Sequence, residues 1–415
     1  MYNIQIILIL CATLILTSCQ NQGLTNSTAS ETTPSSTIWA QDFNDFGHSS
    51  IQANDGGFVT VGSTYSRETG SDGVWIYTSS TFTATETIFK ILDIEDNAKD
   101  DQYNDVIKAD DGGYLIAGTT FQGGTTSDIF IYKVNKDGEK VWDPVLLGSA
   151  TDASSQAIVE TFTGDYVLVG HQMAASGASK LIYVPITDNG TSAATFGAVV
   201  SDFTTSADGG DLDKAYDLDT TVDGDVIIVG DSRSEETSAA TNNTEEDSDI
   251  YVEKVQGGAS GTVVKFFGSD NEDEHGRSIQ QTSDGGYIIA GFTYSEGSGQ
   301  ADGWLIKTDA SLNQDWNQAY GSIYDDKFYS SIQTTDGGFA ALGSSYDSEN
   351  QEQVWVLKVD SSGNKEWERR FGESLADYGA SIEQTNDGGF IISGSKYNAT
   401  SQSDIWIIKL DIFGN

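Results

Sequence analysis

The chain has 415 residues, of which 63 are Asp or Glu and 21 are Lys or Arg, so its formal net charge at pH 7 is −42. Hydrophobic residues make up 37%, and the 45 glycines raise this share to that of a globular protein, which excludes a disordered polyanion. The charge argues against nucleic acid as a partner, and 2 cysteines cannot form a disulfide framework.

An apolar run from Ile4 to Leu16 has the length of a signal-peptide core and is too short to span a membrane as a helix. It ends in Leu16-Thr17-Ser18-Cys19, which resembles the lipobox of bacterial lipoproteins. The resemblance implies that residues 1–18 are removed and that Cys19 is lipidated. The mature chain is then expected on the extracytoplasmic side of the cell envelope, anchored in the outer membrane by its lipid. An uncleaved anchor is the alternative, and residues 1–18 lack the usual basic residues.

Residues 19–37 are rich in Ser, Thr and Asn, which predicts a flexible tether. The remaining segment, 38–415, repeats one motif seven times. Its clearest copies are TSDGGYIIAGFTYS, TTDGGFAALGSSYD and TNDGGFIISGSKYN, whereas FTGDYVLVGHQM and VDGDVIIVGDSR are degenerate. Equivalent turn positions lie 51 to 61 residues apart, at Asp55, Asp111, Thr163, Asp223, Asp284, Asp336 and Asp387.

Each unit is predicted to contain four short strands. In the last unit a first strand ends near Thr385, Asp387-Gly388-Gly389 forms a tight turn, and the apolar run from Phe390 to Ser395 is a buried second strand. The third strand runs from Asp404 to Leu410, and the fourth, in the preceding unit, from Trp367 to Phe371. Four antiparallel strands in about 50 residues fit a propeller blade.

The units resemble the DGG-Y/F repeats of bacterial secreted and lipoprotein β-propellers over the whole of residues 38–415. The sequence therefore predicts an all-β fold, a single seven-bladed β-propeller with four antiparallel strands in each blade. The last unit stops before its fourth strand, whereas the first opens with Trp39-Ala40-Gln41-Asp42-Phe43, which has the spacing of Trp367 and Phe371. We therefore expect the N-terminal strand to complete the seventh blade and close the ring.

Propeller topology places the short turns on one face and the variable, acidic loops on the other, where a binding face is expected. An acid precedes most of the channel strands on this variable face, at Asp101, Asp152, Asp213, Asp273, Asp326 and Asp377. Such a ring of carboxylates is a candidate calcium site. Its recurrence in nearly every blade instead favours caps that accept backbone N–H groups.

The long loop of the fourth unit, between Gly230 and Tyr251, breaks the symmetry of the repeats. With the acidic crossovers beside it, this loop supplies the candidate ligand- or calcium-binding residues Asp211, Asp213, Glu245, Asp247, Asp270 and Asp273. No cofactor is required, and calcium is the candidate ion. A solvated loop is the alternative, because runs of charge are usually solvated.

A second candidate set is aromatic, three residues after the glycine of each second strand: Tyr65, Phe121, Tyr294, Tyr346 and Tyr397. Aromatic side chains around a propeller mouth stack on sugars, but they also pack between adjacent blades.

No catalytic residues can be assigned. The three histidines lack metal-ligand spacing, a G-x-S-x-G motif is missing from the sequence, and the expected acidic mouth disfavours an anionic quinone. The leading hypothesis is a non-catalytic envelope lipoprotein, anchored to the membrane by its lipid, that binds a protein or glycan or acts as a scaffold. The alternative is an extracytoplasmic polysaccharide hydrolase or lyase with an acidic active site on the variable face.

Overall fold

The structure is a computed structural model. It describes residues 34–39, 44–66, 70–82, 87–92, 100–121, 126–147, 152–173, 179–187, 195–196, 200–201, 214–232, 248–256, 259–269, 272–349, 351–372, 376–398 and 402–415. The predicted signal peptide and most of the predicted tether lie outside these ranges.

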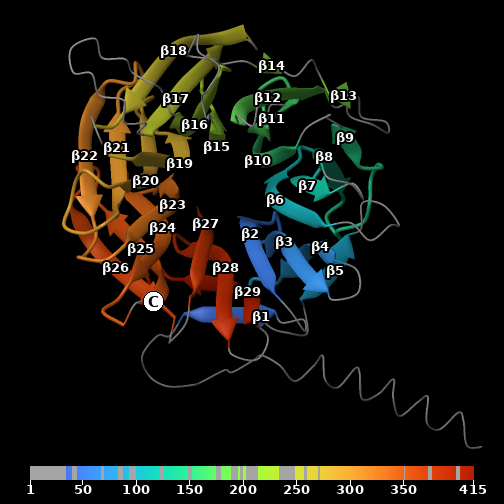
Figure 1. Cartoon of the computed structure of the whole chain (residues 1–415). Helices are drawn as coiled ribbons and strands as arrows, with labels where there is room; N and C mark the ends of the chain where they lie inside the picture. Colours follow the sequence, from blue (N-terminus) through green and yellow to red (C-terminus); the bar gives the residue numbers. More distant parts are fainter. Residues whose placement is uncertain are drawn as a thin grey trace, which may run out of the picture.

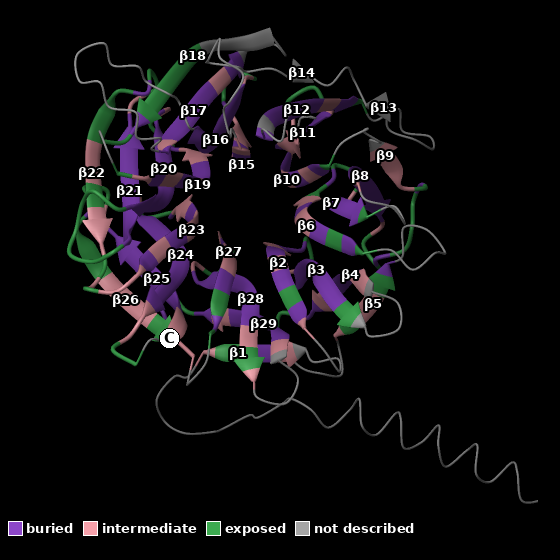
Figure 2. Cartoon of the chain, in the orientation of Figure 1, coloured by how far each residue is buried: buried purple, intermediate pink, exposed green. Residues whose placement is uncertain are grey.

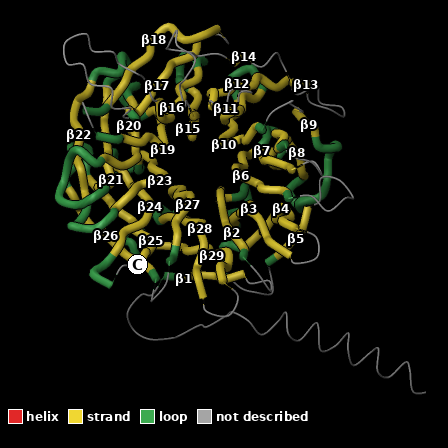
Figure 3. Tube along the Cα trace, viewed as in Figure 1, coloured by secondary structure: helices red, strands yellow, loops and turns green. Residues whose placement is uncertain are grey.

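Seven antiparallel sheets stand around a central channel, as Figure 1 shows. The described residues form strands, turns and loops, with no helix among them (Figure 3). The first strand of each sheet lies next to the channel and the fourth lies at the rim. The predicted seven-bladed β-propeller is therefore confirmed.

The strands of blades 1 to 3 are β2 (Asp45–Gln52), β3 (Phe58–Ser66), β4 (Gly70–Thr78) and β5 (Ile88–Leu92); β6 (Asp101–Lys108), β7 (Tyr114–Phe121), β8 (Ser127–Val134) and β9 (Val145–Leu147); and β10 (Ala153–Glu160), β11 (Tyr166–Met173), β12 (Ser179–Thr187), β13 (Thr195–Phe196) and β14 (Val200–Ser201). In blade 3, β13 and β14 both pair with β12 and share the fourth position.

The strands of blades 4 to 7 are β15 (Lys214–Thr220), β16 (Val226–Ser232), β17 (Asp249–Gln256) and β18 (Ala259–Phe267); β19 (Glu274–Gln281), β20 (Tyr287–Thr293), β21 (Asp302–Thr308) and β22 (Gln314–Tyr320); β23 (Asp326–Gln333), β24 (Phe339–Tyr346), β25 (Glu352–Val359) and β26 (Lys365–Phe371); and β27 (Tyr378–Gln384), β28 (Phe390–Asn398), β29 (Gln402–Leu410) and β1 (Ser35–Trp39).

The N-terminal strand closes the ring, but in a different register from the predicted one. β1 pairs with β29 so that Trp39 lies opposite Ile405. In blade 6 the residue at that place is Phe371, opposite Val354, so the predicted match of Trp39 with Trp367 is wrong by four residues. The observed register lets Ile38 pack on the apolar cluster of blades 6 and 7. The strand begins at Ser35, inside the predicted tether, and Phe43 lies outside the described residues.

The DGG turn is held by its aspartate, as blade 6 illustrates. Gly337 has a φ of +84°, a conformation that favours glycine. Asp336 accepts hydrogen bonds from the Gly338 N–H and the Thr334 hydroxyl, and its carboxylate lies 3.1 Å from Lys358 Nζ at the end of the third strand. Burial opposes these partners, but together they lower the pKa of Asp336 to about 2.

The core lies between neighbouring blades, where the second and third strands are buried (Figure 2). Blades 5 and 6, for example, share a cluster in which the Phe328 and Trp355 rings stack at 4.4 Å. Blades 7 and 1 share a cluster that contains Ile405 and Phe58, so the apolar core continues across the closure. Since every blade buries its faces on two neighbours, each depends on the ring being closed.

The first strands are tied to one another by side chains, because no strand in the described ranges pairs with their inner edges. Asp219 of β15 accepts the Gln281 N–H of β19, at 2.8 Å. Glu383 of β27 accepts the Gln52 N–H of β2, at 2.6 Å, which links the last blade to the first. These bonds satisfy backbone donors that would otherwise face the channel.

Deleting residues 34–39 should lower the free energy of unfolding by several kcal/mol. The deletion removes the pairing of β1 with β29 and the burial of Ile38, and about 1 kcal/mol per hydrogen bond adds to the apolar contribution. Chemical denaturation measures the loss, with deletion of residues 20–25 as the length-matched control. Equal unfolding midpoints for the two deletions would contradict closure by β1.

Candidate functional site

A β-bulge occurs in every first strand, where the pairing with the second strand shifts by one residue. The second strand has a glycine at this point. A Cβ on Gly291, for example, would lie 1.8 Å from the His275 carbonyl oxygen. The seven residues at the bulges are His48, Asn104, Gln156, Tyr216, Arg277, Tyr329 and Ala380.

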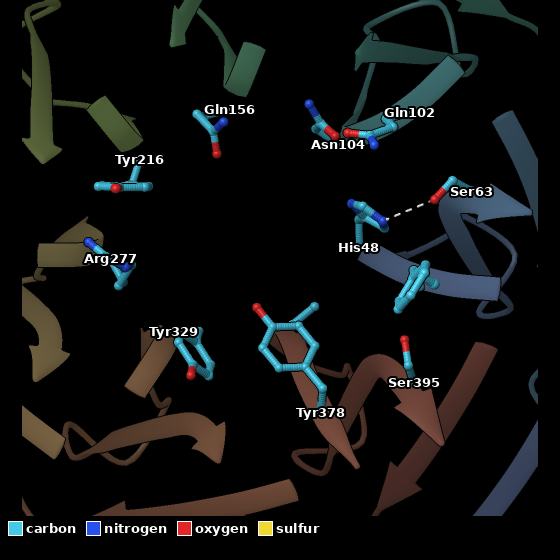
Figure 4. Close-up of a pocket in the computed structure, with 13 residues that line it drawn as sticks. His48, Ser63, Gln102, Asn104, Gln156, Tyr216, Arg277, Tyr329, Tyr378 and Ser395 are labelled. Atoms are coloured by element: carbon cyan, nitrogen blue, oxygen red, sulfur yellow. Dashed lines mark hydrogen bonds between the residues drawn. The ribbon is translucent and has the colours of Figure 1, made fainter. Parts of the chain in front are cut away.

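All seven bulge residues line one central cavity of about 430 Å³. The cavity, called the central pocket below, is also lined by Phe46, Gln102 and Tyr378, two residues before a bulge, and by Ser63 and Ser395 of second strands. Figure 4 shows the labelled side chains around its open centre. The bulges lie in the first halves of their strands, which begin at the crossovers, so the pocket is at the variable-face end of the channel.

Tyrosines and amides dominate the pocket. The rings of Tyr329 and Tyr378 lie 5.0 Å apart, and burial raises the pKa of both hydroxyls. Asn104 donates from Nδ2 to the Ser155 carbonyl oxygen at 2.7 Å, which fixes its orientation. Burial lowers the pKa of His48 to about 4, so this imidazole is neutral at pH 7. The lining therefore offers aromatic faces and neutral hydrogen-bonding groups.

Arg277 is the one Lys or Arg among the described residues that line the pocket. Its Nη1 lies 3.0 Å from both carboxylate oxygens of Asp231, and its guanidinium carbon lies 3.9 Å from the centre of the Tyr216 ring. Asp231 also bonds to His275 Nδ1 at 2.9 Å and to the Gly276 N–H at 3.0 Å. Burial and Asp231 raise the pKa of Tyr216 to about 12, although Arg277 acts in the opposite direction.

Two lysines and a histidine lie near Arg277 on blades 4 to 6, each two residues before a bulge. Lys327 Nζ and the Arg277 guanidinium carbon lie 5.0 and 5.1 Å from the centre of the Phe292 ring. His275 is 4.7 Å from the same ring, and Lys214 holds the equivalent position in blade 4. The acidic segments expected at the mouth, such as residues 208–213 and 245–247, lie outside the described residues, so the acidic mouth stays a prediction.

Four of the predicted crossover acids cap backbone groups. Asp152 accepts the Ser127 N–H, Asp273 the Ser248 N–H, Asp326 the Ser322 N–H and Asp377 the Tyr397 N–H, at 2.5 to 2.9 Å. These contacts are those expected of caps, and each uses one oxygen of its carboxylate. Within the described ranges no group of three or more His, Cys, Asp or Glu side chains is placed to hold a metal ion.

Five of the six predicted ligand-binding acids, Asp211, Asp213, Glu245, Asp247 and Asp270, lie outside the described residues, as does Cys19. Asp273 is the remaining member, and it is a cap. Calcium binding stays a prediction.

The predicted mouth aromatics lie away from the pocket lining. Tyr65, Phe121, Tyr294 and Tyr397 are 37 to 47% exposed, and Tyr346 is half-buried. Tyr294 packs edge-on against Phe292 and His275 of its own blade. Different tyrosines, Tyr216, Tyr329 and Tyr378, line the pocket.

Sequence reasoning missed the pocket residues, although one signal was present. Every unit, including the degenerate ones, has a glycine inside its second strand. A glycine inside a strand indicates a bulge or a close backbone approach. The residue facing it across the sheet can be named only once the register is known.

No protein-family model and no curated protein matches the chain. Solved structures match it at low identity. An α-L-arabinanase of Penicillium chrysogenum, solved with arabinobiose, is 11% identical with a TM-score of 0.52, and the match covers 92% of this chain and 99% of that one. A Dyadobacter fermentans protein of unknown function is 13% identical, TM-score 0.46, with coverage of 73% and 93%. Sqt1 of Chaetomium thermophilum is 13% identical, TM-score 0.48, with coverage of 85% and 80%. These likenesses concern the fold alone.

Two carboxyl groups follow the bulges of blades 2 and 4. Asp105 accepts the Ile158 N–H of the next first strand at 3.0 Å, and Asp217 accepts the Ile279 N–H at 2.9 Å. Burial raises the pKa of both, that of Asp217 to about 7, although the backbone bonds act in the opposite direction. Both groups therefore act as links between blades.

The variant Asp217→Asn should change how stability depends on pH. Because the folded-state pKa of Asp217 is raised, the unfolded state loses its proton first as pH rises. Asp217 therefore contributes stability at low pH that is lost between about pH 4 and about pH 7. As pH rises across that window, the free energy of unfolding of the variant should increase relative to that of the wild type by roughly 1 to 4 kcal/mol. Urea denaturation across this pH range measures the difference, with Asp110→Asn on an exposed turn as control. Parallel pH profiles for wild type and Asp217→Asn would contradict the raised pKa.

Proposed function

We propose that the chain is a non-catalytic, membrane-anchored binding module whose ligand is a glycan held in the central pocket. The observation that carries the proposal is the set of seven bulge residues. Their backbone positions are equivalent, but their side chains differ in nearly every blade. A purely structural channel in a repeat protein has no need of such differences.

The chemistry of the pocket suits a sugar. Tyrosine rings pack on the apolar faces of sugar rings, while amides and hydroxyls bond to sugar hydroxyls. The Ser395 hydroxyl is buried at the pocket edge and has no hydrogen-bond partner in the described part of the chain, so it is available to a polar ligand. A cavity of about 430 Å³ falls in the range of small-ligand sites.

The absence of a carboxylate from the described pocket lining supports binding rather than hydrolysis. Glycoside hydrolysis usually needs two carboxyl groups on opposite sides of the scissile bond. The acids beside the lining are engaged: Asp105 and Asp217 accept backbone N–H groups, and Asp231 bonds to Arg277, His275 and the Gly276 N–H. The arabinanase shares the propeller fold, which many functions use, so a hydrolase remains the rival and product release is measured alongside binding.

The double variant Tyr329→Ala/Tyr378→Ala should weaken glycan binding at least tenfold, because it removes two aromatic faces from the pocket. The matched control is Tyr397→Ala in the same blade as Tyr378, with nearly the same exposure, 37 against 38%, but outside the pocket. A glycan array followed by titration calorimetry supplies the measurement.

Unchanged glycan affinity in the double variant would contradict binding in the central pocket. Release of soluble fragments from a bound polysaccharide would show that the protein is a hydrolase or lyase and contradict a non-catalytic binding module. Binding of a protein but of no glycan would change the class of partner.

The membrane anchor is part of the proposal. Its support is the lipobox-like Leu16-Thr17-Ser18-Cys19 and the apolar run before it. Among the described residues, no helix is long and apolar enough to cross a membrane. A lipid on Cys19 would hold the propeller at the envelope surface, and stable attachment needs two or more acyl chains.

Mass spectrometry of the mature N-terminal peptide should find a lipid-modified Cys19 as the first residue. The variant Cys19→Ser should leave the membrane fraction and appear in the soluble fraction. A mature chain that starts elsewhere, or an unmodified Cys19, rules out this anchor.

A further inference from the structure

We infer that the ligand of the central pocket is an acidic glycan whose sugar carboxylate binds to Arg277. The inference rests on the proposed function, since it names the chemical class of the glycan. Three observations carry it: the fixed orientation of Arg277, its unused donors, and the cations beside it.

Arg277 is held rigidly with part of its guanidinium free. All hydrogen bonds of the Arg277 side chain are made by Nη1, which donates to both oxygens of Asp231 at 3.0 Å and to the Gly276 carbonyl oxygen at 2.7 Å. The plane rests on Tyr216, and the side chain is only 17% exposed. Nε and Nη2 have no hydrogen-bond partner among the described residues, and Figure 4 shows Arg277 between Tyr216 and Tyr329 at the pocket wall.

This free edge matches a carboxylate. A guanidinium presents parallel N–H groups in a fixed plane, which pair with the two oxygens of a carboxylate. The Asp231 carboxylate bonds to His275, to the Gly276 N–H and to Arg277, so it fixes the guanidinium through Nη1 and leaves the edge with Nε and Nη2 available. An arginine that served only to balance Asp231 would not need its remaining donors at a pocket wall.

The neighbouring cations point the same way. Neither Lys214 nor Lys327 forms an ion pair with a described residue. In contrast, the lysines near the ends of third strands pair with turn aspartates: Lys133, Lys254, Lys307, Lys358 and Lys409. In a chain with 63 acidic and 21 basic residues, two lysines without an ion-pair partner among the described residues, on the strands that carry Tyr216 and Tyr329, favour an external anion nearby.

The test is titration calorimetry with short galacturonate and mannuronate oligomers, each as the free acid and as its methyl ester. The ester keeps the sugar and removes the charge. We expect the wild type to bind at least one free acid tenfold or more tightly than its ester. The variant Arg277→Gln should bring this ratio close to one. The control Arg369→Gln removes an arginine from the outer strand β26, where it lies over Trp367, and should keep the wild-type ratio.

Because Arg277→Gln leaves Asp231 without its main partner, thermal melts check that the variant folds. If it does not, Lys327→Gln serves in its place, and it should lower the acid-to-ester ratio severalfold. A folded Arg277→Gln variant that keeps the wild-type ratio overturns the inference, as does a ratio unchanged by Lys327→Gln.

Equal binding of acids and esters, or a preference for neutral sugars on the array, overturns the inference and leaves the glycan-binding module standing. If the protein binds no glycan, acidic or neutral, both the proposed function and this inference are wrong.

Discussion

The close approach of seven glycines to seven bulged strands is the constraint on which the rest of the site depends. A Cβ at these glycines would lie 1.7 to 2.4 Å from a carbonyl oxygen of the first strand, for example at Gly343 and Gly118, so no other residue fits without moving the backbone. The crowding is the local cost of the bulge, and the bulge turns one extra side chain per blade toward the channel. The fold thus presents seven equivalent positions and leaves their side chains free to differ.

The chain separates residues that build the ring from residues that fill its centre. Many repeated residues have partners: turn aspartates such as Asp336 bond to their own loop and to a lysine, and crossover aspartates such as Asp152 accept backbone N–H groups. Others do not, since Oδ1 of Asp326 is buried without a hydrogen-bond partner among the described residues. The bulge residues do not repeat, and Arg277 and Ser395 retain unused hydrogen-bonding groups at the pocket. Unsatisfied polar groups in a protein interior are costly, so those that line the pocket are candidates for contact with a ligand or water.

The repeat was enough to predict the blade number, the strand order and closure by the N-terminal strand, because each depends on periodicity along the chain. The register of that strand could not be obtained this way. The Trp39–Phe43 spacing fits a fourth strand by sequence, whereas burial of Ile38 decides the register by packing. The site was missed for a similar reason. Arg277 lies four residues after Asp273, and only the pairing of β19 with β20 shows that one is a bulge and the other a cap.

A net charge of −42 and an arginine at the pocket wall are compatible, because surface charges and a buried guanidinium act on a ligand over different distances. At physiological ionic strength the Debye length is about 8 Å, so carboxylates on exposed outer loops are largely screened from the centre of the channel. Arg277 is mostly buried, and its interaction with a bound anion is screened much less. The acidic surface then opposes loose adsorption of polyanions, while the proposed acidic sugar would have to fit against Arg277 and the tyrosines to bind. In the proposed binding mode, repulsion at the surface and a single fixed guanidinium in the pocket would together select a ligand by its shape as well as its charge.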